Sequence, residues 1–281
     1  MVLLNLLRVR QWYKNLVILL ALIFGGLILD LGSWAFMMLG FFSLCLISSA
    51  NYIINDIIDR DKDRLHPEKK NRPIASGKIS LIEAMLITAI LLLGGFSIAY
   101  LLSINFTLLA IGLFTLNQVY SFFLKNEPFA DILAISTNFV IRAVSGSVLI
   151  NLSISPWLVL CTFFLALFLG SAKRHSEVLL LKESAAYHRP VLKYYTIGLT
   201  NALMTISASL LMLSYSLYSL LSQHKMLMLS MPFALYVIIR YYSLAENGSP
   251  IGRNTELAIR DKGLVIGSLL WILVAIMVIM L

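Results

Sequence analysis

Charged side chains are scarce in this sequence. Only 13% of its 281 residues are Asp, Glu, Lys or Arg, whereas 59% are hydrophobic. In ordinary soluble domains about a quarter of the residues are charged, so this chain has too few charges to cover a surface that faces water. Most of its apolar residues must face lipid instead, which excludes an ordinary soluble globular domain.

Cysteine is nearly absent as well. Cys45 and Cys161 each lie inside an apolar run, where neither a disulfide framework nor a cysteine-ligated metal is expected. We interpret both as small buried hydrophobic residues. The apolar run that follows the first residues also lacks a small-residue cleavage site. We therefore expect it to be a retained first span and not a cleaved signal peptide.

Long apolar runs recur along the whole chain. A helix needs about 20 mainly apolar residues to cross the hydrocarbon layer, and nine runs are candidates. They lie at about 15–29, 34–55, 81–102, 105–124, 131–150, 156–172, 197–221, 226–245 and 263–281. The pattern of short alternating strands that is typical of a membrane barrel is absent. The sequence therefore predicts an all-α, polytopic membrane protein with nine transmembrane helices in one domain, residues 1–281.

Basic residues are concentrated in every second loop. They precede the first span and gather again in the loops at about 56–80, 125–131 and 173–196 and after the eighth span. By the positive-inside rule, these loops and the N-terminus are cytoplasmic, and the C-terminus lies on the outer side of a plasma (inner) membrane. The same loops explain the net charge of +8, so no nucleic-acid partner is expected. Thirteen of the fourteen acidic residues share the cytoplasmic side, which indicates that the chemistry is there.

An aspartate-rich segment leaves the second span. Asp56, Asp59 and Asp63 follow at i, i+3 and i+7, which puts their side chains on one narrow stripe if the helix continues. Three like charges on one stripe repel, and no basic residue shares that stripe. A divalent cation would remove the conflict, because Mg²⁺ prefers oxygen ligands and bridges carboxylates to substrate phosphates. The segment therefore predicts a Mg²⁺ and diphosphate site, with Asn55 beside it as a neutral oxygen ligand or a donor to phosphate.

The residues around this stripe have separate predicted roles. Asp61 points to another side, where we expect it to be solvated or paired with a neighbouring Arg or Lys. Arg72 can reach phosphate oxygens as a planar fork, and Ser80 is a candidate N-cap for the third span. The alternative interpretation of the whole segment is a solvated acidic helix end, but a boundary helix usually carries mixed charges, and ionisable residues that emerge from an apolar bundle are functional candidates.

Two stretches together match a known family. The acidic segment at 55–63, Asn-Asp-x-x-Asp-x-x-x-Asp, is followed by Arg-Pro-Ile-Ala-Ser-Gly at 72–77. This combination resembles the first aspartate-rich motif of the UbiA superfamily of intramembrane prenyltransferases. The resemblance implies nine transmembrane helices around a central cavity open to the cytoplasmic side, and an isoprenyl diphosphate bound through Mg²⁺.

The second aspartate motif departs from the usual family pattern, Asp-x-x-x-Asp at the start of the fifth helix. Asp131 matches the first carboxylate, but the position four residues later is Ile135. Arg142 follows on the same helix, and a helical-face calculation puts Asp131, Asn138 and Arg142 close to one stripe. Arg142 lies about three turns into the predicted span at 131–150, where an arginine needs a polar interior and an anionic partner.

This departure resembles the polyprenyl-phosphate phosphoribosyltransferase branch of the superfamily. Shorter matches along the chain support it: Arg-Gln-Trp-Tyr-Lys-Asn at 10–15, Ser-Pro-Trp at 155–157, Ala-Lys-Arg-His-Ser-Glu at 172–177 and His-Arg-Pro-Val-Leu at 188–192. The branch implies transfer of 5-phosphoribose from phosphoribosyl pyrophosphate to a decaprenyl-like polyprenyl phosphate, with release of pyrophosphate, in the synthesis of a cell-envelope arabinose donor. The oligomeric state stays open.

Such a site holds more negative charge than a simple prenyl transfer, so additional cations are required. The candidate catalytic and metal-binding residues are Asp56, Asp59 and Asp63. The candidate substrate-binding residues are Lys14, Asn55, Arg72, Lys125, Asp131, Arg142, Lys173, Arg174 and Arg189. For Lys173, an i, i+4 salt bridge with Glu177 is a competing explanation.

Two other functions remain as alternatives. A Mg²⁺-dependent prenyltransferase that moves an isoprenyl group to an aromatic or lipid acceptor shares the first motif and the fold, but Ile135 and the added cations speak against it. A transporter or a non-catalytic lipid-binding protein explains the spans but not the carboxylate stripe. Transporters also tend to break paired helices with Gly or Pro at mid-membrane, and no such pair is evident here.

Overall fold

All regular structure in the described part of the chain is helical. The computed structural model describes residues 2–65, 69–181 and 190–280, and these ranges contain no strand. The α-helices are α1 (Val2–Leu6), α2 (Leu20–Phe24), α3 (Leu31–Ile58), α4 (Arg60–Leu65), α5 (Leu81–Leu102), α6 (Ile104–Phe122), α7 (Ala130–Leu149), α8 (Pro156–Leu181), α10 (Ile197–Leu221), α11 (Met231–Glu246), α12 (Pro250–Arg253) and α13 (Lys262–Met280). The 3₁₀ segments between them are η1 (Val9–Leu19), η2 (Lys69–Asn71), η3 (Leu124–Asn126), η5 (Pro190–Tyr194), η6 (Lys225–Ser230) and η7 (Thr255–Arg260). The all-α prediction is confirmed.

The chain folds into two compact units. The first unit consists of Met1–Ser121 and Ile141–Ser153, and the second unit consists of Phe122–Val140 and Ile154–Leu281. Helix α7 contributes to both: its N-terminal part belongs to the second unit and its C-terminal part to the first. The boundary between Val140 and Ile141 lies within this continuous helix, where a division leaves no linker or change of composition in the sequence.

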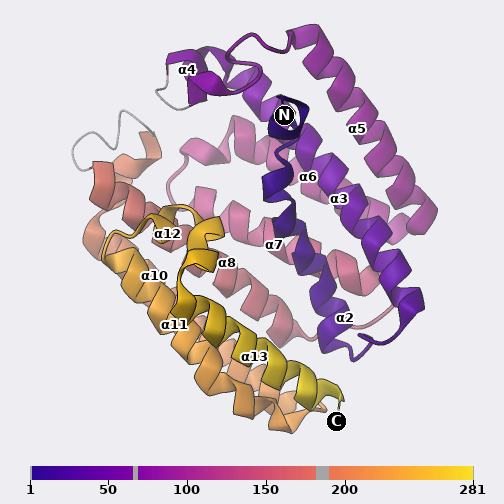
Figure 1. Cartoon of the computed structure of the whole chain (residues 1–281), viewed down its shortest axis with the longest axis vertical. Helices are drawn as coiled ribbons and strands as arrows, with labels where there is room; N and C mark the ends of the chain where they lie inside the picture. Colours follow the sequence, from indigo (N-terminus) through magenta and orange to yellow (C-terminus); the bar gives the residue numbers. More distant parts are fainter. Residues whose placement is uncertain (1, 66–68, 182–189, 281) are drawn as a thin grey trace. The chain divides into compact units, whose positions relative to one another are not determined.

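Close packing of α3 along α5 is the main helix pair of the first unit (Figure 1). Ser43 of α3 donates its hydroxyl to the carbonyl oxygen of Gly95 at 2.8 Å. A Cβ at Gly95 would lie 2.7 Å from the side chain of Ile47. Small residues at a helix contact allow such an approach in membrane proteins, where lipid provides no hydrophobic drive for helices to associate.

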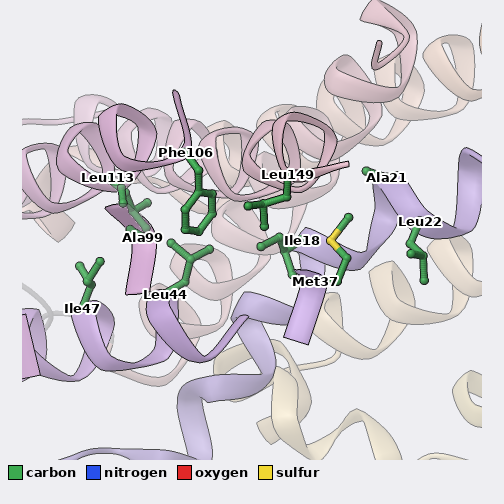
Figure 2. Close-up of a cluster of buried hydrophobic side chains, with 11 residues drawn as sticks. Ile18, Ala21, Leu22, Met37, Leu44, Ile47, Ala99, Phe106, Leu113 and Leu149 are labelled. Atoms are coloured by element: carbon green, nitrogen blue, oxygen red, sulfur yellow. The ribbon is translucent and has the colours of Figure 1, made fainter. Parts of the chain in front are cut away.

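A buried apolar cluster joins η1, α2, α3, α5, α6 and α7 of this unit. Figure 2 shows Ile18 of η1, Met37 and Leu44 of α3, Phe106 of α6 and Leu149 of α7 directed into one core. This core fixes η1, which carries several polar residues of the candidate site, against α3 and the end of α7.

A close backbone contact holds η1 in the same place. A Cβ at Gly146 of α7 would lie 2.0 Å from the carbonyl oxygen of Ile18. No side chain fits at this position, so glycine is needed for η1 and α7 to approach each other.

The second unit is built on two helix pairs. Helix α8 packs against α10, and α11 packs against α13 (Figure 1). A smaller buried cluster of Ile132, Val191, Leu192 and Tyr195 ties the start of α7 to η5. These contacts position Asp131, the acidic residue in the first turn of α7.

Seven helices, not nine, have the length and hydropathy of a membrane span in the described part of the chain. They are Leu31–Ile58, Leu81–Leu102, Ala130–Leu149, Pro156–Leu180, Ile197–Leu221, Lys225–Glu246 and Lys262–Met280. The predicted first span at 15–29 is not one helix, because η1 gives way to α2, and α2 ends at Phe24 before Gly25 and Gly26. The predicted fourth span corresponds to α6, whose polar residues, such as Asn117 and Gln118, reduce its hydropathy.

Candidate active site

Two aspartates of the acidic segment converge on one guanidinium. Asp56, near the end of α3, and Asp63, in α4, have only 2% and 3% of their surfaces exposed. Nη1 of Arg72 donates to Oδ1 of Asp56 at 2.9 Å and to Oδ2 of Asp63 at 2.6 Å. The two carboxylates therefore face the same point, and a single cationic nitrogen lies between them.

Asp59, the third member of the predicted stripe, contacts Asn55. Helix α3 ends at Ile58, and Asp59 caps it with φ −89° and ψ 5°. Oδ2 of Asp59 accepts a hydrogen bond from Nδ2 of Asn55 at 3.2 Å. Asp61 is 88% exposed and lies 3.5 Å from Arg64, as the sequence predicted. Among the described residues, no group of three or more His, Cys, Asp or Glu side chains is arranged to hold a metal.

The turn after α4 explains why Arg72 reaches both carboxylates. The amide of Ser76 donates to the carbonyl oxygen of Arg72 at 2.9 Å, which closes a helical turn over residues 72–76. Ile74 is buried and anchors this turn in the apolar cluster below it. Gly77 then takes φ +75°, a conformation that favours glycine. The predicted N-cap follows: Ser80 accepts from the amide of Glu83 at 3.2 Å in a complete capping box, so this prediction is confirmed.

A second guanidinium reaches Asp56 from the N-terminus. Nη2 of Arg8 donates to Oδ1 of Asp56, the same oxygen that Arg72 contacts. The Arg8 guanidinium also lies over the ring of Tyr52, 4.8 Å from its centroid. One turn earlier on α3, Ser49 accepts from Trp12 at 3.0 Å and donates to the carbonyl oxygen of Leu7 at 2.8 Å. The N-terminal segment is therefore held along one face of α3.

The backbone of Arg8 is strained. Its φ of 49° and ψ of 45° lie in the left-handed region, which costs a non-glycine residue roughly 1–2 kcal/mol. Such conformations persist only where surrounding contacts determine them, and they are concentrated at functional sites. The contacts with Asp56 and Tyr52 are the observed determinants here.

Arg142 lies in a buried polar group of the first unit. Nε of Arg142 donates to Oδ1 of Asn15 at 2.8 Å, and Ser48 donates to the same oxygen at 3.4 Å. Nδ2 of Asn15 donates in turn to Sγ of Cys45 at 3.3 Å. Cys45 is a free, buried cysteine, as predicted. An arginine residue with 7% of its surface exposed inside a candidate membrane span requires such an oriented polar surrounding.

Asp131 lies in a buried network of the second unit. Its Oδ2 accepts from Nε of Arg174 at 2.9 Å, and its Oδ1 accepts from the hydroxyl of Tyr195 at 2.6 Å. Nη1 of Arg174 also donates to Glu177 at 2.6 Å. Burial, together with the hydrogen bond to Asp131, raises the pKa of Tyr195, so its hydroxyl stays a protonated donor. The amide of Phe129 donates to the same hydroxyl at 3.1 Å from a backbone with φ 65°.

The remaining predicted residues belong to different parts of the chain. Lys14 is half-buried in η1 of the first unit, and Lys125 is half-buried in η3 of the second unit. Lys173 is exposed on α8, next to the buried Arg174. Arg189 lies outside the described residues.

Comparison with known proteins now decides the family. The family model described as "UbiA prenyltransferase family" matches residues 16–251. The chain belongs to this family. A protein of Corynebacterium glutamicum named decaprenyl-phosphate phosphoribosyltransferase is 32% identical, over 96% of this chain and 84% of the relative. A protein of the same name from Mycolicibacterium smegmatis is 29% identical, over 94% of this chain and 88% of the relative.

Solved structures agree on the fold. A UbiA homologue from Archaeoglobus fulgidus, bound to GPP and Mg²⁺, superposes with a TM-score of 0.76. The match covers 100% of both chains at 22% identity. At this identity the similarity establishes the UbiA fold alone.

Sequence reasoning missed three members of these networks. Arg8 was counted only among the basic residues that orient the N-terminus, although it contacts the first UbiA motif. Tyr195 was not among the candidate site residues, although it donates to Asp131. Glu177 was considered only as a partner of Lys173, although it also accepts from Arg174 at i, i+3. Only the quoted match at 10–15, two residues after Arg8, hinted that the N-terminal segment takes part.

Proposed function

We propose that this UbiA-family protein transfers 5-phosphoribose from phosphoribosyl pyrophosphate to a decaprenyl-like polyprenyl phosphate and releases pyrophosphate. The observation that carries the proposal is the similarity over nearly the full length to proteins named decaprenyl-phosphate phosphoribosyltransferase. Two cations of the first unit, the half-buried Arg72 and the buried Arg142, suit a reaction whose substrates are both phosphorylated.

The reaction requires little acid–base chemistry. An oxygen of the lipid phosphate attacks the anomeric carbon of the ribose, while the bond from that carbon to the diphosphate oxygen breaks and its electron pair leaves with pyrophosphate. The acceptor phosphate is already an anion at neutral pH, so no strong general base is needed. Negative charge develops on the leaving group, and preorganised cations stabilise it most in the transition state.

The acidic pair fits a magnesium ion. Asp56 and Asp63 direct carboxylate oxygens, the ligands that Mg²⁺ prefers, at one point, and Asp59 follows Ile58 at the same helix end. When bound there, Mg²⁺ would stabilise charge on the leaving pyrophosphate. We assign Asn55 and Arg72, which contact the acidic segment, to donate to phosphate oxygens, and we assign Lys14 of the same unit to this task as well. Lys125 is kept as a candidate phosphate-binding residue of the second unit. In UbiA homologues of known structure, Mg²⁺ is bound together with GPP or DMAPP.

We assign Asp131 to positioning and not to the metal. Both of its oxygens accept hydrogen bonds, from Arg174 and Tyr195. A metal would have to displace these two donors, and Ile135 supplies no second carboxylate to replace them. The polar partner that Arg142 requires in its span would then include a substrate phosphate in addition to Asn15.

The protein is an integral membrane protein, and we further propose that this site faces the cytoplasm, as the distribution of basic loops predicts. The orientation can be checked by labelling single cysteines placed at residue 62 and residue 223 in intact cells. A membrane-impermeant reagent should reach position 223 and not position 62. The opposite result would place the site on the outer side.

The direct test uses the purified chain in detergent with Mg²⁺, a polyprenyl phosphate and radiolabelled phosphoribosyl pyrophosphate, followed by extraction into organic solvent. We expect label in the lipid phase that is lost without Mg²⁺ and in Asp56→Asn. If no label enters the lipid, but an isoprenyl group moves from its diphosphate to an aromatic acceptor, the prenyltransferase alternative is correct.

A further inference from the structure

The carboxylate pair of the first unit already holds a cation. Nη1 of Arg72 lies 2.9 Å from Oδ1 of Asp56 and 2.6 Å from Oδ2 of Asp63. A divalent metal held by Asp56 and Asp63 would need the region that this nitrogen occupies. Arg72 and such a metal would therefore compete for the same two carboxylates.

Asp56, Asp63, Arg8 and Arg72 form one group of side chains in direct contact, and the formal charges of these four are balanced without a metal. Asp56 and Asp63 contribute two negative charges, and Arg8 and Arg72 contribute two positive charges through direct contacts. A metal ion that entered alone would add two positive charges to a nearly buried, neutral group. A metal that enters with a diphosphate keeps the group close to neutral, because the diphosphate brings the compensating negative charge.

The two arginines differ in how firmly they are held. Arg8 is fixed by its left-handed backbone and by the ring of Tyr52 in addition to Asp56. The described contacts of the Arg72 guanidinium are the two carboxylates alone, and a quarter of its side chain is exposed. A long arginine side chain on a fixed turn can move to a phosphate while its backbone stays in place, and guanidinium binds phosphate bidentately.

We propose that Arg72 competes with the metal for Asp56 and Asp63. Without substrate, its guanidinium bridges the two carboxylates. It leaves them only when a metal arrives together with a diphosphate that can accept the guanidinium. Metal and diphosphate then bind cooperatively, and free metal alone is disfavoured. The inference builds on the proposed function only in requiring that this site takes a divalent metal and a diphosphate.

The test measures metal binding instead of turnover. Mn²⁺ is titrated into the purified full-length chain in detergent, with and without pyrophosphate, and bound Mn²⁺ is obtained from the loss of the electron paramagnetic resonance signal of free Mn²⁺, corrected for the Mn²⁺–pyrophosphate complex. For the wild type we expect pyrophosphate to raise the Mn²⁺ affinity about 5- to 150-fold, the usual range of coupling between two sites. In Arg72→Gln, Mn²⁺ alone should bind about tenfold more tightly, and pyrophosphate should add much less.

A matched control separates the bridge from the loss of a charge. Lys62→Gln removes one positive charge beside Asp63, but Lys62 is exposed and takes no part in the contacts of Arg72 with Asp56 and Asp63. It should keep the coupling of the wild type. If Arg72→Gln binds Mn²⁺ no more tightly than Lys62→Gln, the proposed competition between Arg72 and the metal is refuted.

The wild type alone provides a second test. If it binds Mn²⁺ equally well with and without pyrophosphate, the proposal fails, whatever the stability of the Arg72 variant. Failure of the proposed function is distinguishable from this result. Cooperative binding without phosphoribosyl transfer would support the competition at Arg72, with another diphosphate as the substrate. Transfer without cooperative binding would refute only the competition at Arg72.

Discussion

Replacing Arg174 by Gln would leave the buried carboxylate of Asp131 without its cation. Arg174 and Asp131 have 1% and 0% of their surfaces exposed, and Nε and Oδ2 lie 2.9 Å apart. Removing one partner of such a pair costs about 3–5 kcal/mol, because the remaining charge stays buried without compensation. Tyr195 still donates to the other oxygen of Asp131, and Glu177 can be solvated more easily. We therefore expect about 3 kcal/mol, the lower end of this range.

Thermal unfolding in detergent measures this effect. A loss of about 3 kcal/mol lowers the midpoint on the order of 10 °C in a chain of this size. Lys173→Gln removes the same charge from the preceding, exposed position of α8 and should change stability by less than about 0.5 kcal/mol.

The double variant Asp131→Asn/Arg174→Gln completes the experiment. Removing both charges should restore much of the stability that Arg174→Gln loses, because an uncharged pair leaves no buried ion. If Arg174→Gln keeps the wild-type midpoint and loses activity, Arg174 contacts substrate and the network has no structural role. That result would refute the assignment of Asp131 to positioning.

Three further predictions can be measured on the same preparations. Asp56→Asn should nearly abolish turnover while the thermal midpoint is kept, because it removes a formal charge from the metal site; near-normal turnover would refute the site. Gly146→Ala should cost about 1–3 kcal/mol through the clash with the backbone of η1, whereas Gly112→Ala, which has open space, should be neutral or stabilising by up to about 1 kcal/mol; equal midpoints would contradict this. The hydrogen bond from Arg240 lowers the pKa of Asp261. The interaction therefore stabilises the fold fully above the ordinary aspartate pKa of about 3.9, and this stabilisation is lost as pH falls through the lowered pKa. Acid should therefore reduce the midpoint of the wild type more than that of Arg240→Gln.

Local patterns in the sequence predicted much of the structure. Apolar runs located the long helices, because lipid requires each spanning segment to satisfy its own backbone groups. The cap at Ser80 and the exposed position of Asp61 were also predictable, because their causes lie within a few residues. The predicted end of the first span, residue 29, lies beyond the observed end of α2 at Phe24, because hydropathy measures apolar content and does not register that Gly26, at φ 71°, cannot continue a helix.

Long-range contacts could not be predicted in the same way. Arg8 and Asp56 are separated by 48 positions, and Arg142 and Asn15 by 127. No periodicity relates such residues, so the N-terminal basic run was interpreted by its charge alone. The carboxylate stripe was predicted from spacing, but the cation that lies between two of its members in the structure, Arg72, was expected at phosphate.

The two arginine–aspartate networks differ in solvation, and this difference separates their roles. In the first unit the guanidinium side chains of Arg8 and Arg72 are 23% and 25% exposed, so an arriving ligand can compete for them from solvent. In the second unit the side chains of Arg174 and Asp131 are 2% and 0% exposed, and releasing either would leave a buried ion. Exchange of cations is therefore feasible at Asp56 and Asp63 and strongly opposed at Asp131. Ile135 agrees with this division. If Asp131 is paired with Arg174 and binds no metal, as we propose, a second carboxylate at position 135 would have no metal to bind.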